Sequence, residues 1–341
     1  MSGTADLELF RARTRDIAAG RGLSEAEAAE MMQAVVSGCV PEDLLAAYLV
    51  ALSDKGESVD EIVGSARVLR AAALPFAAPP DTVDTCGTGG DGQNTFNIST
   101  VAALVVAAVG QPVVKHGNRS ASGRVGSADL LAELGVPTDL PPAVSAEQLH
   151  RDHFAFLFAP QYHPAARHAA GVRKRLGRPT IFNLLGPLCN PARPAFQVTG
   201  TSGSCRARKV AEAHLQLGTR HAFVVTSANG TDELTPSAAN EAFEVADGQV
   251  TERRFSAADA GLAVHPPEAL RGGDAAANAA IALRVLWGER GAPRDAVLMN
   301  AGLALIAAGR ESSLAAAAAR CGECLDHGAV LALLYRLRGY A

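Results

Sequence analysis

The feature that most constrains the fold is a glycine-rich segment, Asp84-Thr85-Cys86-Gly87-Thr88-Gly89-Gly90-Asp91-Gly92. A short strand is predicted before it at 82–84, and Asn97-Ile98-Ser99-Thr100 opens a helix predicted over 99–109. Glycines let the backbone approach an anion closely, and the start of a helix offers N–H donors to it. The segment therefore predicts a phosphate site in an α/β domain. It lacks the Gly-Lys-Ser/Thr sequence of a P-loop, which disfavours an ATPase.

The apolar periodicity changes at a proline-rich linker, 74–80. Before the linker, apolar residues recur at helical spacing, and Ser24 with Glu27 has the pattern of a capping box. After the linker, short apolar runs at 112–115, 154–158, 196–199 and 222–225 alternate with predicted helices at 127–134, from 164, and at 206–217. This alternation predicts an α/β fold: a small all-helical domain followed by a larger α/β domain with a mostly parallel central sheet.

The end of the chain adds two further predictions. The runs 243–245 and 250–255, joined around Asp247-Gly248, are typical of an edge hairpin. The Ala-rich residues that follow are predicted to be helical.

A basic segment, Lys115-His116-Gly117-Asn118-Arg119-Ser120-Ala121-Ser122-Gly123, follows the predicted strand 112–115. Its many hydrogen-bond donors suit a pyrophosphate and ribose hydroxyls, and the ends of strands are where α/β proteins form their ligand crevices. Ser127 is predicted to cap the next helix and to remain able to contact phosphate.

Composition excludes several classes of protein. The net charge of −4 argues against a general nucleic-acid binder. The longest apolar run, 101–109, is far shorter than a membrane span, and residues 1–6 do not resemble the start of a signal peptide. The six scattered cysteines indicate a reducing, cytoplasmic setting. The pair Cys321-x-x-Cys324 has no second pair to complete a zinc site, so we expect it to be structural.

Four segments, 84–100, 115–129, 156–178 and 180–190, together resemble the anthranilate phosphoribosyltransferase family. The helical beginning and the Ala-rich end are similar to that family too, so the resemblance covers essentially the whole chain. It implies a nucleoside phosphorylase/phosphoribosyltransferase-like architecture and a homodimer formed through the small domain. The implied small domain is 1–78 with a returning piece at 164–186. The implied large domain is 79–163 and 187–341, and it carries the phosphoribosyl pyrophosphate site.

The resemblance also implies residue roles. For phosphoribosyl pyrophosphate they fall to Gly87, Gly90, Asp91, Thr95, Asn97, Ile98, Ser99, Thr100, Lys115, His116, Gly117, Asn118, Arg119, Ser120, Ala121, Ser122, Gly123 and Ser127. For anthranilate they fall to Gly87, Asn118, His163 and Arg173. For Mg²⁺ they fall to Ser99, Asp232 and Glu233.

The implied reaction transfers the 5-phosphoribosyl group to the amine of anthranilate, giving N-(5-phosphoribosyl)anthranilate and pyrophosphate, the second step of tryptophan synthesis from chorismate. The attacking amine is neutral near pH 7, so no residue is assigned as a general base. Two places depart from the family pattern. Gly123 and Val125 stand where many relatives carry a small hydroxyl, and Thr226-Ser227 stands in place of a frequent His-Gly.

Two alternatives remain open. A pyrimidine nucleoside phosphorylase shares the architecture, but it carries a Lys-His-Ser-type segment where this chain has Thr85-Cys86-Gly87. A non-catalytic paralogue that binds nucleic acid would have a basic surface and altered acceptor residues. The charge of −4 and the presence of Asn118 and Arg173 argue against it.

Overall fold

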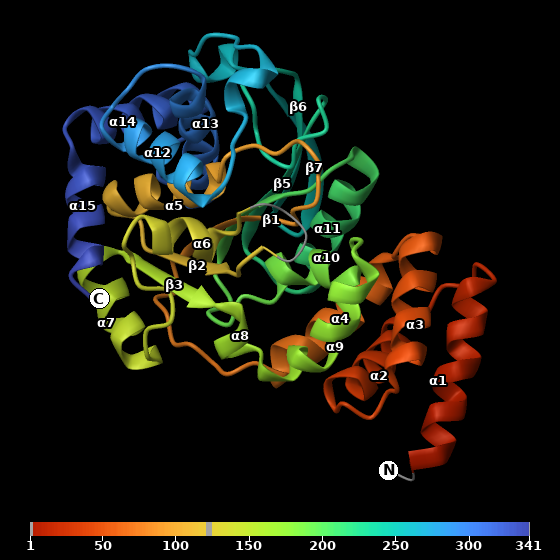
Figure 1. Cartoon of the computed structure of the whole chain (residues 1–341). Coiled ribbons are helices and arrows are strands. Elements are labelled where there is room, and N and C mark those ends of the chain that lie inside the picture. The colour runs from red at the N-terminus through yellow and green to blue at the C-terminus, as the bar shows by residue number, and fades with distance from the viewer. Residues whose placement is uncertain (1–2, 121–124, 341) are drawn as a thin grey trace. The chain divides into compact units, whose positions relative to one another are not determined.

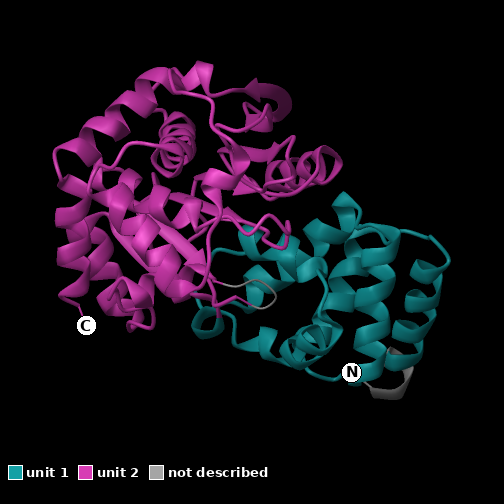
Figure 2. Cartoon of the chain, turned by 45° about the horizontal axis from the view of Figure 1, so that its top comes forward, with its two compact units in different colours: residues 1–75, 160–191 teal, residues 76–159, 192–341 magenta. Residues whose placement is uncertain are grey.

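The computed structural model describes residues 3–120 and 125–340 (Figure 1). The chain divides into two compact units, residues 1–75 with 160–191 and residues 76–159 with 192–341 (Figure 2). The sequence-based limit of the small domain was 78, and its returning piece was expected over 164–186. No helix among the described residues is long and apolar enough to cross a bilayer.

The first unit is helical. Its elements are α1 (Gly3–Ala18), α2 (Glu25–Val36), α3 (Glu42–Lys55), α4 (Val59–Ala72), α8 (Ala159–Tyr162), the 3₁₀ turn η1 (Pro164–Ala166), α9 (Arg167–Leu176) and α10 (Ile181–Leu188). The capping box predicted at Ser24 and Glu27 is confirmed, and a second one at Ser58 and Glu61 starts α4. Both boxes satisfy backbone N–H groups that a helix start leaves without partners.

The side chain of Glu61 also connects three helices of this unit through hydrogen bonds. Its buried carboxylate accepts hydrogen bonds from Lys55 Nζ at 2.8 Å, from the Leu23 N–H at 3.0 Å and from the Ser58 N–H at 2.8 Å. The residue that caps α4 therefore also anchors the start of α2 and the end of α3. A buried carboxylate is tolerated because each of its oxygens has a partner.

The second unit is built on one seven-stranded sheet with the order β3-β2-β1-β4-β5-β6-β7. Its strands are β1 (Val83–Gly87), β2 (Val113–Gly117), β3 (Phe154–Phe158), β4 (Phe196–Gly200), β5 (His221–Ser227), β6 (Asn240–Ala246) and β7 (Gln249–Phe255). The first five are parallel, and β6 and β7 are antiparallel, so the predicted mostly parallel sheet is confirmed. The predicted edge hairpin is confirmed as well. Asp247 and Gly248 have φ of 51° and 77°, as a two-residue hairpin turn requires.

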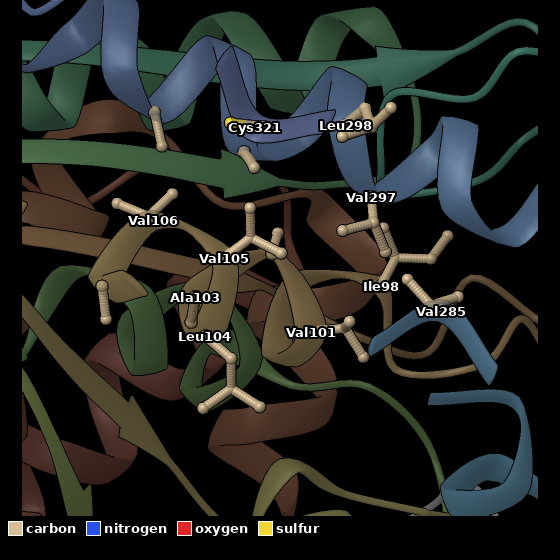
Figure 3. Close-up of a cluster of buried hydrophobic side chains, with 14 of the residues drawn as sticks. Ile98, Val101, Ala103, Leu104, Val105, Val106, Val285, Val297, Leu298 and Cys321 are labelled. Carbon is tan, nitrogen blue, oxygen red and sulfur yellow. The ribbon is translucent and has the colours of Figure 1, made fainter. Parts of the chain in front are cut away.

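Helices surround this sheet. They are α5 (Ile98–Ala108), α6 (Ser127–Glu133), α7 (Pro142–Asp152), α11 (Ser204–Gln216), the 3₁₀ turns η2 (Ala258–Ala260) and η3 (Pro267–Leu270), α12 (Ala275–Leu286), α13 (Ala292–Ala307), α14 (Leu314–Asp326) and α15 (Ala329–Arg338). The core is aliphatic, as expected. Figure 3 shows part of this core, with Val101 and Val105 of α5 and Val297 and Leu298 of α13 among its labelled side chains. Helix α5 is buried on nearly all sides, so the end of the glycine-rich segment that leads into it is held in place.

Helices α7 and α10 were not predicted, and several strands, β2 among them, are longer than expected. Helix α7 escaped notice because the residues it buries are mostly polar, with Leu149 the exception. Helix α10 was noted only as a motif, and it contains Pro187. Strand β2 continues through His116 and Gly117, which pair in register with β3. Part of the basic segment is therefore strand rather than loop.

Candidate active site

The glycine loop leaves the carboxyl end of β1 beside the end of β4. The Thr88 N–H donates to the Gly200 carbonyl at 2.8 Å, which ties the first residue of the loop to the neighbouring strand. Positive φ values of 63°, 74° and 75° belong to Gly89, Gly90 and Gly92. Only glycine adopts such angles without strain, so this loop path requires the glycines of the motif.

Asp232, in the loop after β5, crosses directly over the ends of β1 and β4. A Cβ at Gly87 would lie 2.7 Å from Asp232 Oδ2, and a Cβ at Gly200 would lie 1.5 Å from the Asp232 carbonyl oxygen. The same Oδ2 accepts a hydrogen bond from the Gly89 N–H at 2.9 Å. Both strands therefore end in glycine because a side chain there would displace the acidic loop.

Two further carboxylates meet the same place. Glu233 Oε1 accepts a hydrogen bond from the Ser99 N–H at 3.2 Å, in the first turn of α5. Asp91 Oδ2 accepts one from the Asp232 N–H at 3.3 Å. We call Asp91, Asp232 and Glu233 the carboxylate cluster. The positive end of the α5 dipole favours negative charge at this position.

Lys115 supplies a buried cation beside this cluster. It lies on β2 with 2% of its surface exposed, and its Nζ donates to the Thr85 carbonyl at 2.5 Å. Nζ also lies 3.5 Å from Ser99 Oγ. The ammonium thus lies next to the residue that was expected to bind metal. The structure brings together predicted residues from three parts of the sequence: Gly87, Asp91, Ser99, Lys115, Asp232 and Glu233.

The charges of the cluster are incompletely balanced. Burial raises the pKa of the Asp232 carboxyl, and the negative charge of Asp91 raises it further. Burial also raises the pKa of Glu233, with a second contribution from Asp232 and an opposing one from Lys115. A divalent cation bound here would stabilise the ionised form of both carboxyl groups and offset the unbalanced negative charge.

Across residues 3–120 and 125–340, no three His, Cys, Asp or Glu residues are spaced to hold a metal ion by themselves. The protein would supply only part of a coordination shell. Mg²⁺ is commonly bound in this way, by one or two carboxylates together with the phosphates of a substrate. The residues present therefore fit a magnesium ion that arrives with a phosphorylated ligand.

The end of the basic segment is organised by an aspartate that was not predicted. Asp129 Oδ2 accepts hydrogen bonds from the N–H groups of Gly126 at 2.9 Å and Ser120 at 3.1 Å. The prediction that Ser127 caps α6 is wrong. Gly126 occupies the cap position, and Ser127 Oγ instead donates to the Asn118 carbonyl at 3.4 Å. A carboxylate at the third helical position can satisfy the first N–H groups without a capping hydroxyl.

Other predicted donor residues have differing environments. The Asn97 amide donates to the Val125 carbonyl at 3.0 Å and accepts from Asn278 Nδ2 at 3.0 Å. Asn278, on α12, was missed because no local pattern links residues 181 positions apart. Ile98 and Thr100 are fully or almost fully buried, so only their backbone could reach a ligand.

Arg119, another predicted donor residue, lies 3.7 Å from Asp129 Oδ1 through its Nη1. Thr95 forms a bridge with Arg271. Ala121, Ser122 and Gly123 lie outside the described residues. Of the departures from the family pattern, Thr226 Oγ1 accepts from the Gly203 N–H at 3.0 Å.

His163 and Arg173 belong to the first unit, whereas the donor-site residues belong to the second. His163 Nε2 lies 2.9 Å from the Cys189 carbonyl, which can only accept, so Nε2 carries the proton. Burial lowers the pKa of His163. Burial also lowers the pKa of Arg173, whose guanidinium carbon lies 5.1 Å from the centre of the Phe182 ring.

Comparison with known proteins first defines the class. Residues 79–331 match the a/b domain of the glycosyl transferase family, and residues 14–73 match its helical bundle domain. The helical unit and the α/β unit with its phosphate-type loop thus have the architecture of this glycosyl transferase family.

Individual relatives narrow the class. The chain is 46% identical to the anthranilate phosphoribosyltransferase of Novosphingobium aromaticivorans, over 92% of this chain and 94% of that protein. It is 46% identical to anthranilate phosphoribosyltransferase 2 of Streptomyces coelicolor, over 93% of this chain and 95% of that protein. The chain belongs to the anthranilate phosphoribosyltransferase family.

Solved structures agree with this assignment. The Thermus thermophilus anthranilate phosphoribosyltransferase superposes with a TM-score of 0.89 at 43% identity, covering 96% of this chain and 98% of that one. A Saccharomyces cerevisiae anthranilate phosphoribosyltransferase in complex with PRPP and Mg superposes with a TM-score of 0.88 at 24% identity, covering 98% of this chain and 99% of that one. At that identity, the second comparison supports the fold alone.

Proposed function

We propose that this enzyme transfers the 5-phosphoribosyl group of phosphoribosyl pyrophosphate to the amine of anthranilate. The products are N-(5-phosphoribosyl)anthranilate and pyrophosphate, in the second step of tryptophan synthesis from chorismate. The observation that carries the proposal is the convergence of the carboxylate cluster and Lys115 on the glycine loop, in a chain of this family. The yeast relative described above was solved with the same donor and with Mg.

The donor is proposed to lie along the glycine loop and the basic segment. Backbone N–H groups of the loop and the start of α5 would hold the pyrophosphate, and Lys115 would balance its charge. Ser99, Asp232 and Glu233 would hold Mg²⁺. When bound, the ion would neutralise negative charge on the departing pyrophosphate.

The acceptor is proposed to contact Gly87, Asn118, His163 and Arg173. Arg173 would bind the anthranilate carboxylate with the paired N–H groups of its guanidinium. Within the described part of the chain, Arg173 forms no ion pair with a carboxylate, so no internal partner competes with this binding.

Catalysis is proposed to depend mainly on positioning. The anthranilate amine attacks the anomeric carbon as the bond from that carbon to the pyrophosphate oxygen breaks, and the amine proton leaves to solvent. A neutral aromatic amine needs no strong base before attack, so alignment of the two substrates dominates. Cys86 is not proposed as a nucleophile because burial raises the pKa of its thiol, which keeps it protonated.

The setting of the enzyme is also proposed. We expect a homodimer formed through the helical unit, with domains close to 1–78 plus 164–186 and to 79–163 plus 187–341. A cytoplasmic location is supported by six cysteines that are all free thiols.

The first experiment mixes the purified chain with phosphoribosyl pyrophosphate, Mg²⁺ and anthranilate, and follows the fluorescence of anthranilate. Fluorescence should fall only when all three are present, and pyrophosphate should appear in equal amount. Phosphate-dependent cleavage of thymidine would instead indicate a nucleoside phosphorylase. Salt-sensitive binding to a DNA oligonucleotide without turnover would indicate a nucleic-acid binder.

Two variants test the residue roles. Arg173→Ala should raise the KM for anthranilate far more than the KM for the donor. The matched control is Arg175→Ala, because Arg175 lies on the same helix but pairs with Glu42 at 2.6 Å. Asp232→Asn combined with Glu233→Gln should shift the Mg²⁺ requirement. Unchanged metal dependence would contradict their assignment.

A further inference from the structure

Three arginines on or just after α9 have different partners. Arg175 pairs with Glu42 at 2.6 Å, and Arg178 pairs with Asp54 at 2.6 Å. Arg173 has no carboxylate within 4.0 Å among the residues that the structure describes, and its guanidinium lies over the ring of Phe182 at 5.1 Å. The three side chains share a sequence neighbourhood, yet Arg175 and Arg178 pair with carboxylates of α3, whereas Arg173 lies over a ring of α10.

The local chain geometry fixes the ring of Phe182. Helix α9 ends at Gly177, whose φ of 61° reverses the chain. Thr180 is the N-cap of α10, and its N–H donates to Asn183 Oδ1 at 3.1 Å. Phe182 is the second residue of α10 and keeps 7% of its surface exposed. The ring is therefore held by helix capping and burial on the same unit as Arg173.

An aromatic ring stabilises a guanidinium differently from a carboxylate. The ring face attracts the cation and limits its motion, but it takes up none of the five N–H donors. A carboxylate partner would occupy those donors and compete with an incoming acid. Arg173 is thus held in place while its hydrogen-bonding capacity stays available.

We propose that Phe182 is a positioning residue for the acceptor: its ring orients the Arg173 guanidinium for the carboxylate of the aromatic amine acid. This inference rests on the proposed function, in which Arg173 binds that carboxylate. It goes further by assigning acceptor recognition to an arginine–phenylalanine pair rather than to the arginine alone. Phe182 itself acts through Arg173.

The test is a double-mutant cycle on the full-length enzyme, with KM measured for both substrates. Phe182→Leu should raise the anthranilate KM by about 2- to 30-fold, the change expected for loss of a partly desolvated cation–π contact. The KM for phosphoribosyl pyrophosphate should stay within about twofold. In an Arg173→Ala background, the same substitution should have no further effect on the anthranilate KM.

Two other variants separate positioning from packing. Phe182→Tyr keeps the ring face and should keep the anthranilate KM near that of the parent. Phe10→Leu is the matched packing control, because Phe10 is a buried ring of the same unit that packs on Tyr48 at 5.1 Å. It should lower thermal stability without a change specific to anthranilate. Site-specific incorporation of increasingly fluorinated phenylalanine at 182 should raise the anthranilate KM in steps.

The outcomes distinguish the two levels of inference. Suppose that Arg173→Ala raises the anthranilate KM, but that Phe182→Leu raises it by the same factor in the parent and in the Arg173→Ala background, or changes the KM of both substrates equally. Phe182 then contributes only to packing, and the inference is overturned. If Arg173→Ala itself leaves the anthranilate KM unchanged, the proposed carboxylate contact fails, and the inference fails with it for that separate reason.

Discussion

Replacing Gly87 with alanine is expected to raise the Mg²⁺ concentration required for half-maximal activity. The added Cβ would lie 2.7 Å from Asp232 Oδ2, whereas ordinary contacts of a Cβ begin near 3.4 Å. The carboxylate must therefore retreat by about 0.7 Å. A shift of this size along the hydrogen bond from the Gly89 N–H, the largest change it can cause, would lengthen that bond from 2.9 Å to about 3.6 Å and break it.

The size of the effect follows from that lost bond. A hydrogen bond to a charged group contributes about 1.5–3 kcal/mol, which corresponds to about 10- to 150-fold in an equilibrium constant. We expect a change of this order in the Mg²⁺ requirement at saturating donor and acceptor. The assay follows anthranilate fluorescence during a Mg²⁺ titration.

Matched variants make this prediction refutable. Gly22→Ala is the control, since nothing lies within 4 Å of its added Cβ. Asp232→Asn should show a similar phenotype, and its combination with Gly87→Ala should be less than additive. An unchanged Mg²⁺ requirement in Gly87→Ala, or a change in the anthranilate KM alone, would refute the reasoning that the glycine serves to make room for Asp232.

Three further predictions concern stability. Gly200→Ala should destabilise the second unit by more than about 3 kcal/mol in urea unfolding, because its Cβ would meet the Asp232 backbone and overpacking of this kind has no flexible neighbour to yield. Glu61→Ala should destabilise the first unit by about 1–3 kcal/mol because the Leu23 N–H, the Ser58 N–H and the partly buried Lys55 ammonium lose this acceptor, and an unchanged urea midpoint would contradict this. His163→Gln should make the free energy of unfolding fall less steeply as the pH is lowered. Since burial lowers the pKa of His163, its contribution is present above its ordinary value of 6.5 and is lost as pH falls through the lower folded value.

Local sequence patterns were sufficient to predict most of the order of helices and strands and the presence of the glycine-rich loop. The capping box at Ser24, the hairpin turn at Asp247 and the glycine loop each depend on the conformational preferences of a few adjacent residues, which a sequence displays directly. The family resemblance extended this reading to residue roles, which stay predictions. Helix α7 was missed because the residues it buries are mostly polar and therefore show no apolar periodicity of a helix.

The tertiary structure decided which distant groups meet. Glu233 reaches the Ser99 N–H across 134 positions, Asn278 supports Asn97 across 181, and Asp232 explains why β1 and β4 both end in glycine. The pairing of Arg173 with Phe182, rather than with an acid, is of the same kind. Sequence determines local conformation through short-range sterics and hydrogen bonding, but charge balance and close approach depend on which strand ends and helix starts the fold places side by side.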